Sequence, residues 1–268
     1  VRDSAAYLDL LRTDSPILFP RPAAPESFLG SLDQAPRPLR IAVMARHPLG
    51  ETLHSEVRDA VLASARLCAD LGHQVEEIDQ PVDYKPAVNA MNNLICLHTW
   101  QDVAAIACAR NLNLDTAQLE TSTRLMAQLG SELPAVDYAA SLDTLVAVAA
   151  DMAAFHQRFD ILLSPVLNLS TARLGWLDMN SGDIREYVGR YREYSGYTAL
   201  FNGTGQPAMS VPLAQDSQGL PIGSQFSAAW GQDALLLQLA RQLEQAQPWP
   251  TLAPPFSGAP SGPDPLTD

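Results

Sequence analysis

The sequence is short of positive charge. It contains one lysine, Lys85, and 17 basic residues against 30 acidic ones in 268, which gives a formal net charge of −13. Phosphate backbones are bound by clustered Lys and Arg, so this balance argues against a nucleic-acid partner. The acidic residues are spread along the chain without a run of five like charges, which is typical of a surface that charge keeps soluble.

Cysteine is scarce as well. Cys68, Cys96 and Cys108 are odd in number and show no CxxC spacing, so the sequence indicates neither a disulfide framework nor a structural zinc site. Cys96, His98 and Cys108 can be imagined as a metal set, but buried thiols on apolar segments explain the cysteines better. The histidines include no HxxxH or HExxH pair that would place two ligands on one helix face. We therefore expect no metal and no cofactor.

Long uncharged apolar runs are missing too. None approaches the roughly 18 residues that cross a bilayer, and no secretory signal peptide opens the chain. We expect a cytoplasmic protein without a membrane partner. Because the chain starts at Val1, its true N-terminus and any targeting signal are left open.

Common catalytic and cofactor motifs are absent or out of context. No GxSxG elbow occurs, so a Ser-His-Asp hydrolase is not indicated. Residues 203–208 (GTGQPA) match the dinucleotide pattern GxGxx[GA], but we expect a helix before them and a strand after them, the reverse of a phosphate loop. We interpret them as a helix-to-strand turn, in which Gly203 and Gly205 supply unusual φ values and Asn202 tolerates a left-handed cap.

Helical and strand patterns alternate along the rest of the chain. Strands are predicted at 40–45, 74–78, 160–166, 208–213 and 222–229. Helices are predicted at 1–12, 55–71, 86–111, 115–130, 137–159, 184–201 and 233–245. The strand–helix–strand unit at 40–78 predicts a parallel crossover, and Gly219-Leu220-Pro221 predicts a turn between two strands, as a hairpin or a broader connection. The pattern predicts an α/β fold with a mixed β-sheet flanked by helices.

The sequence predicts a single domain over residues 1–256. A proline-rich irregular connection is expected at 14–40 and a disordered tail at 257–268. The first helix lacks a start signal, because Asp3 stands at the acidic position of a capping box whose Ser or Thr would precede Val1. We therefore expect that the chain was cut within a structural element.

A series of motifs runs in one order along the chain. They are VRDSA at 1–5, ADLGHQV at 69–75, DILLSP at 160–165, FNGTGQPA at 201–208 with SVP at 210–212, and GLPIGSQ at 219–225. This series resembles the C-terminal portion of the amidase signature family, Ser-Ser-Lys hydrolases of carboxylic amides. Among its members it is most similar to bacterial amidases such as the cyclic nylon-oligomer hydrolases. One departure is Val166, which stands where a Thr is common in the family. The resemblance implies the C-terminal part of the amidase signature fold.

The resemblance also implies a mechanism. A Ser attacks the amide carbonyl, a second Ser on a cis peptide relays the proton, a Lys acts as base, and backbone N–H groups stabilise the oxyanion. The Gly/Ser-rich nucleophile loop would lie before Val1, so no catalytic residue is placed on this sequence. Lys85, in a Tyr-Lys-Pro context, does not match the base. The missing N-terminal part of the same enzyme is thus the expected partner, and a homodimer is left open.

Three residues are candidates for the substrate pocket. In family members that bind an amino-acid amide, an acidic residue about two helical turns before the FNxTG segment recognises the ammonium group. Ser195 holds the matching position, so the resemblance implies a small, uncharged or apolar amide substrate. Pro165 ends a buried strand, where ligands collect in open α/β sheets, although strand termination alone also explains it. Asn202, in the most specific motif, completes the set.

Two functions fit these observations. The first is a portion of an amidase that is inactive on its own. Binding groups that lack a nucleophile and a base lose most of the rate acceleration. The alternative is a non-catalytic binding module or pseudoenzyme that pairs with a separate catalytic subunit. The particular amide and the oligomeric state are left open.

Overall fold

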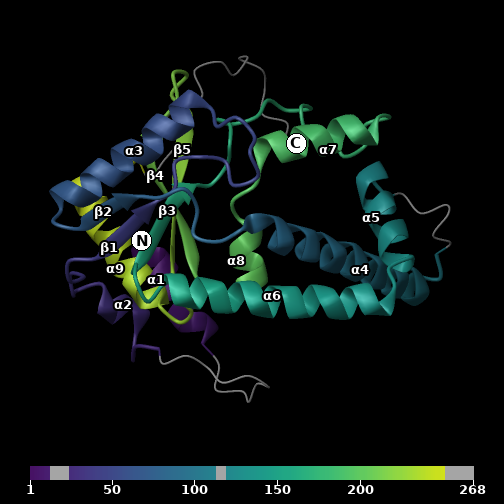
Figure 1. Ribbon diagram of the computed structural model, residues 1–268, viewed down its shortest axis with the longest axis horizontal. Helices are drawn as coiled ribbons and strands as arrows, with labels where there is room; N and C mark the ends of the chain where they lie inside the picture. Colours follow the sequence, from purple (N-terminus) through teal and green to yellow (C-terminus); the bar gives the residue numbers. More distant parts are fainter. Residues whose placement is uncertain (13–23, 113–118, 251–268) are drawn as a thin grey trace, which may run out of the picture.

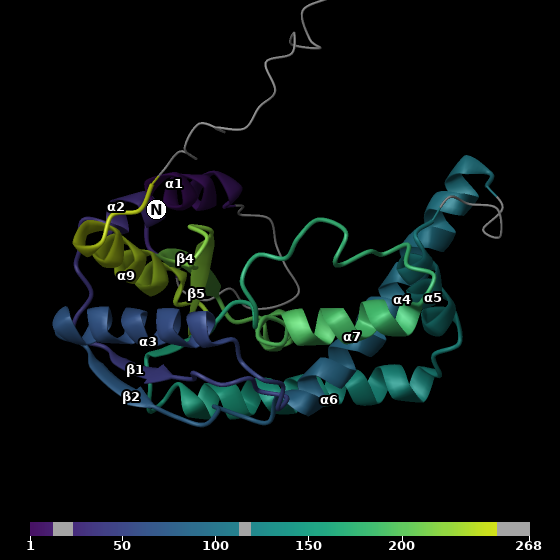
Figure 2. The ribbon, with the colours of Figure 1, turned by 90° about the horizontal axis from the view of Figure 1, so that it is seen from above.

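The computed structural model describes residues 1–12, 24–112 and 119–250. Within these residues a five-stranded sheet with the order β2-β1-β3-β5-β4 lies at the centre. Helices cover both of its faces, and α4, α5 and α6 form an arm that extends away from it (Figures 1 and 2). The predicted tail at 257–268 lies outside the described residues. So do residues 14–23 of the connection predicted at 14–40.

The sheet is mixed, as the sequence predicted. Strands β1 (Arg40–Val43), β2 (Gln74–Glu77) and β3 (Ile161–Pro165) are parallel, and β1 lies between the other two. Strand β5 (Pro221–Ala228) runs antiparallel to β3, and β4 (Ala208–Gln215) pairs antiparallel with β5. The turn predicted at 219–221 therefore joins an antiparallel pair, whose register shifts between Val211 and Ala214.

The number of long helices in the described residues agrees with the prediction, but their bounds differ. Their bounds are α1 Arg2–Leu11, α2 Phe28–Ser31, α3 Ser55–Asp70, α4 Tyr84–Arg110, α5 Thr121–Ser131, α6 Ala135–Phe155, α7 Ile184–Tyr194, α8 Ala199–Thr204 and α9 Asp233–Ala246. The connection predicted as irregular contains α2, whose start is capped by the Ser27 side chain.

The single helix predicted at 184–201 is wrong, because α7 ends at Tyr194 and α8 begins at Ala199. Gly196 between them has a φ of +146°, which a helix does not allow. The turn predicted at 203–208 also needs correction. Asn202 and Gly203 are helical residues of α8, and Gly205 alone takes the left-handed conformation, with a φ of +72°. A helix does precede this segment and a strand does follow it, as predicted.

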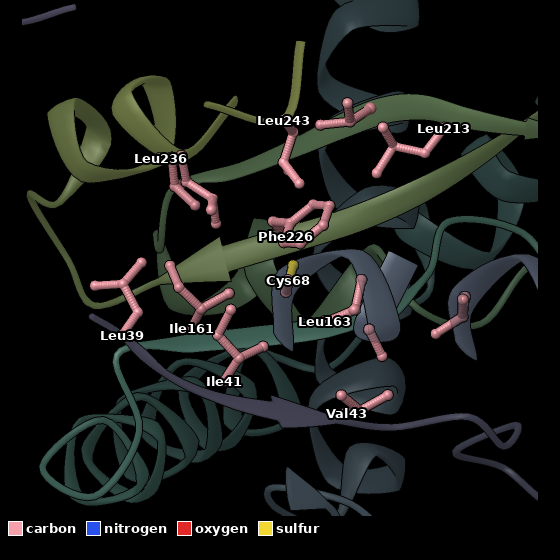
Figure 3. Packing of buried hydrophobic residues seen from close by; sticks show 14 of the residues in the cluster. Leu39, Ile41, Val43, Cys68, Ile161, Leu163, Leu213, Phe226, Leu236 and Leu243 are labelled. Atoms are coloured by element: carbon pink, nitrogen blue, oxygen red, sulfur yellow. The ribbon is translucent and has the colours of Figure 1, made fainter. Parts of the chain in front are cut away.

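One core fills the space between the sheet and helices α3 and α9. Alternate strand residues point into it, among them Ile41, Ile161, Leu163 and Phe226, each fully buried (Figure 3). Burying one such side chain contributes roughly 1.5–3 kcal/mol. Helix α9 buries Leu236, Leu239, Ala240 and Leu243 on its inner face.

A second core covers the opposite face of the sheet. Leu162 of β3 and Met44, directly after β1, meet α4, α6 and α8 there, so β3 is buried on both faces. On α6 the buried residues of this core are Leu145, Val148 and Met152. The helix ends at Phe155, four residues before the predicted end, and Phe159 reaches the same core from the following turn.

Helix α6 is the one helix of the described segments that is long and apolar enough to cross a membrane. Its best window has a mean hydropathy of 1.3 and is 22% buried in the structure. Core helices of soluble proteins pass the same test, so length and composition alone decide little. Exposed aspartates interrupt α6 at Asp137, Asp143 and Asp151.

Candidate functional site

Pro165 closes β3 at the carboxyl end of the parallel strands. It is buried and pairs with Ser224 of β5. The chain then turns toward α7, where Asn168 is fully buried. This places Pro165 at the sheet edge where pockets of open α/β folds form, as predicted from its position at the end of a strand.

Asn168 ties the segment after β3 to the end of α7. Its side-chain amide donates to the carbonyl oxygens of Thr52 at 2.8 Å and Glu193 at 2.9 Å. Its backbone N–H donates to the carbonyl of Tyr194 at 2.9 Å, and Tyr197 Oη donates to its Oδ1 at 3.4 Å. Asn168 thus fixes three loops at once. Sequence analysis missed it, because a lone Asn after a strand reads as an ordinary loop residue.

Ser195 lies directly after α7, half-buried and with extended backbone angles. Its N–H and its Oγ both donate to the carbonyl of Tyr191, at 2.9 and 2.8 Å. Its own carbonyl accepts a hydrogen bond from the Nε2 of His47 at 2.9 Å. The hydroxyl is therefore neutral and satisfied by the helix end, and it carries no charge toward a ligand.

His47 follows β1, and its side chain is buried, with 3% of the residue exposed. Its Nδ1 accepts the backbone N–H groups of Leu49 at 3.2 Å and Glu51 at 3.3 Å. Because both partners are donors, the ring proton is on Nε2, the atom that faces the Ser195 carbonyl. Sequence analysis gave His47 no role, and nothing in its spacing signals the contact with Ser195.

Asn202 stands apart from the other two candidates. It is an exposed residue inside α8, whose neighbours Leu200 and Phe201 fill the second core. Asn168, three residues after Pro165, bonds to Glu193 and Tyr194 just before Ser195, and Asn202 lies on a separate helix. The role of all three in substrate binding stays a prediction.

An open hollow of about 380 Å³ lies beside the end of α7. It is lined by Glu51, Thr52, Gly189, Arg192 and Glu193. Arg192 pairs with Glu51 across it, with 3.2 Å between Nη2 and Oε1. Both side chains of this exposed ion pair near Ser195 therefore already have a partner of opposite charge.

The sequence also drew attention to Lys85 and to the three cysteines. Lys85 is exposed at the start of α4, where its backbone N–H donates to the capping Asp83. No group of three His, Cys, Asp or Glu side chains gathers within the described segments to hold a metal ion. The prediction of buried thiols is confirmed for Cys68, whereas Cys96 is half-buried and Cys108 is exposed.

Comparison with known proteins gives this arrangement a family. The Amidase family model matches residues 1–237. The chain is 31% identical over 268 residues to the 6-aminohexanoate-cyclic-dimer hydrolase of Pseudomonas sp. (strain NK87), and 29% identical over 266 residues to that of Paenarthrobacter ureafaciens. Each alignment covers 93% of this chain and 52% of the relative. The chain thus spans about half the length of these relatives.

A solved structure of 6-aminohexanoate cyclic dimer hydrolase superimposes on this fold with a TM-score of 0.80 and 26% identity. The superposition covers 92% of this chain and 53% of the other. Fold and sequence together define an α/β chain of the amidase type. This chain belongs to the Amidase family.

Proposed function

We propose that this chain is the C-terminal portion of an amidase that hydrolyses the C–N bond of uncharged or apolar carboxylic amides. Its catalytic residues would be encoded before Val1. One observation carries the proposal: the chain matches about half of each hydrolase over nearly its own whole length. The Gly/Ser-rich loop that holds the nucleophile in the family has no counterpart in this half.

The free edge of the sheet supports the proposal. Within the described segments β4 pairs with β5 on one side only, and Ala208, Ser210 and Pro212 along it are exposed. Unpaired strand edges invite pairing with another strand. An upstream portion of the same enzyme would extend the sheet here and complete a cleft near the candidate residues.

In the complete enzyme the upstream portion would supply the chemistry. A Ser hydroxyl adds to the amide carbonyl while the cis-Ser passes its proton toward the Lys, and the amine leaves with a proton. Water then cleaves the acyl-enzyme and restores the Ser. The part played by this chain is to form a pocket wall with Ser195, Pro165 and Asn202, which orients the amide for attack.

The substrate class follows from Ser195. Its hydroxyl is neutral and bonded to the Tyr191 carbonyl, and the nearby Glu51 is paired with Arg192. Residue 195 itself offers an ammonium group no carboxylate, whereas a neutral amide loses nothing there. Cyclic amides such as the one in the name of the relatives are therefore suitable test substrates.

A substrate panel on the complete enzyme tests this assignment. We expect kcat/KM for neutral cyclic, alkyl and aryl amides to exceed that for α-amino amides by at least about tenfold, the effect of one missing charge-assisted bond. Ser195→Asp should shift the preference toward α-amino amides, with Ser217→Asp as an exposed control. A wild-type preference for α-amino amides would contradict the assignment.

The alternative is a non-catalytic module that pairs with a separate catalytic subunit. The specific observation in its favour is that the chain has cores on both faces of its own sheet. Cooperative thermal unfolding of residues 1–268 alone would favour this alternative. A molten state, with secondary structure but without fixed packing, would favour the portion of a longer enzyme.

A further inference from the structure

The ring of His47 connects two segments that lie 148 positions apart. One ring nitrogen orders the loop after β1 by accepting two backbone N–H groups, and the other donates to the Ser195 carbonyl at the break between α7 and α8. The two bonds to Nδ1 require a neutral ring, and the bond to the Ser195 carbonyl requires a proton on Nε2. The position of the Ser195 backbone therefore depends on one tautomer of one side chain.

The neighbouring residues leave the ring little freedom. A Cβ on Gly196 would lie 2.4 Å from His47 Nε2, so only a glycine lets the backbone come this close. Its φ of +146° is likewise one that other residues rarely adopt. Tyr197 packs edge-on against the ring, with 5.4 Å between the centroids. A shift of the ring must therefore move the turn at Ser195–Tyr197, and a shift of this turn must move the ring.

We propose that His47 is a positioning residue, whose neutral ring holds the Ser195–Gly196 turn in the wall of the substrate pocket and whose protonation releases it. The inference rests on the proposed function for the pocket. The contacts of the His47 ring with Leu49, Glu51 and Ser195, called the latch below, all lie within this chain. Protonation places an N–H on Nδ1, where the N–H groups of Leu49 and Glu51 already point. Both acceptor bonds are then lost, and the ring can no longer keep its place.

Tyr197 and Glu51 contact the ring directly, Arg46 precedes it in the chain, and Arg192 contacts Glu51. Tyr84 of α4 interacts with Tyr197, and Glu193 of α7 stands two residues before Ser195. Arg46 pairs with Asp79, and Glu51 with Arg192. Burial raises the pKa of both tyrosines, so they stay neutral between pH values of about 5 and 8, where imidazole titrates.

Two substitutions test the roles of the two ring nitrogens of His47 separately. His47→Asn keeps an acceptor near the place of Nδ1, but its amide is too short to reach the Ser195 carbonyl. His47→Gln keeps an N–H donor at the reach of Nε2, and its amide does not titrate. His54→Gln replaces an exposed histidine seven residues further on and serves as the matched control.

NMR of the complete enzyme, with the residues of this chain labelled, tests the latch without any activity. We expect the amide signals of Gly196 and Tyr197 to move as the pH falls from about 8 to 5, the range of imidazole titration. In His47→Gln they should stay at their pH 8 positions, and in His47→Asn they should lie near the low-pH positions at either pH. His54→Gln should match the wild type. Unshifted signals in His47→Asn, or a pH response that survives in His47→Gln, would overturn the proposal.

The complete enzyme shows whether the latch acts on substrate. One lost hydrogen bond predicts a KM about 5–10-fold higher in His47→Asn, with kcat little changed, and recovery in His47→Gln. A purely structural role would instead lower Tm and leave KM unchanged, which contradicts positioning. If the wild-type enzyme hydrolyses no amide, the proposed function fails, and the NMR result still decides whether the latch exists.

Discussion

Gln225 of β5 donates its side-chain N–H to the hydroxyl oxygen of Ser164 on β3, at 3.2 Å. Both residues are almost fully buried, with 4% and 1% of their surface exposed. They come from the two family motifs at 160–165 and 219–225, and they face each other in the register of the sheet. The contact between Gln225 and Ser164 therefore explains one residue of each motif.

Loss of this contact should destabilise the sheet. Gln225→Ala removes the buried donor to the Ser164 oxygen and opens a small space, so we expect a loss of about 1–3 kcal/mol in the free energy of unfolding. Gln218→Ala, at an exposed position in the β4–β5 turn, should change it by less than about 0.5 kcal/mol. Urea unfolding of both variants measures the difference, and equal losses would contradict this role of Gln225.

The crossing of α4 and α5 depends on a glycine. A Cβ on Gly130 would lie 2.0 Å from the carbonyl oxygen of Cys96, so Gly130→Ala must push the two helices apart. We expect a loss of about 1–3 kcal/mol, the usual cost of overpacking. Gly189→Ala in α7 meets nothing within 4 Å and should be neutral, or stabilising by up to about 1 kcal/mol through helix propensity. Thermal unfolding compares the two, and a tolerated Gly130→Ala would disprove the close crossing.

Asp160 anchors the start of β3 and gives stability that depends on pH. Burial alone would raise its pKa, but hydrogen bonds from Arg37 at 2.7 Å and from the N–H of Arg40 at 2.8 Å outweigh burial and hold the pKa below its ordinary 3.8. A lowered pKa means that the contribution is complete above the ordinary value and is lost as the pH falls through the folded one.

Asp160→Asn should therefore lower the free energy of unfolding at pH 7 by about 1–2 kcal/mol, and the difference from wild type should shrink below a pH of about 4. Asp79→Asn removes an exposed partner of Arg46 and should have almost no effect. Urea unfolding across this pH range gives both curves. A difference between wild type and Asp160→Asn that grew toward acid pH would have the wrong sign.

The three cysteines should differ in reactivity. Burial raises the pKa of Cys68 to about 12, and it raises that of Cys96 as well, whereas Cys108 is exposed. A thiol reagent at pH 8 should therefore label Cys108 first and Cys68 only after unfolding, since the thiolate is the reactive form. Mass spectrometry locates the label. Rapid labelling of Cys68 in the folded chain would show that the first core is open.

The elements with a strong pattern were predictable from the sequence. The parallel β1–α3–β2 unit follows from the strand–helix–strand pattern at 40–78, and Gly72, with a φ of +92°, allows the chain to leave α3. The break between α7 and α8 was missed, because residues 184–201 read as one helix and the close approach of Gly196 to His47 is a contact between distant segments.

The candidate site was predictable only in part. Pro165 followed from the end of a buried strand, and Ser195 from the family resemblance. His47 and Asn168 were missed because their bonds go to backbone carbonyls and N–H groups of distant loops, and such partners leave no mark in a sequence pattern. Asn202 was expected at a left-handed cap, whereas the structure gives that conformation to Gly205.

Amide hydrolysis by the purified 268-residue chain is the most direct test of the account, which assigns it a pocket wall without a nucleophile or a base. Neutral aryl and cyclic amides are incubated with the chain, and product is compared with a buffer blank. The account predicts release at the rate of the blank. Turnover above the blank that disappears when a serine or Lys85 of this chain is replaced would contradict it.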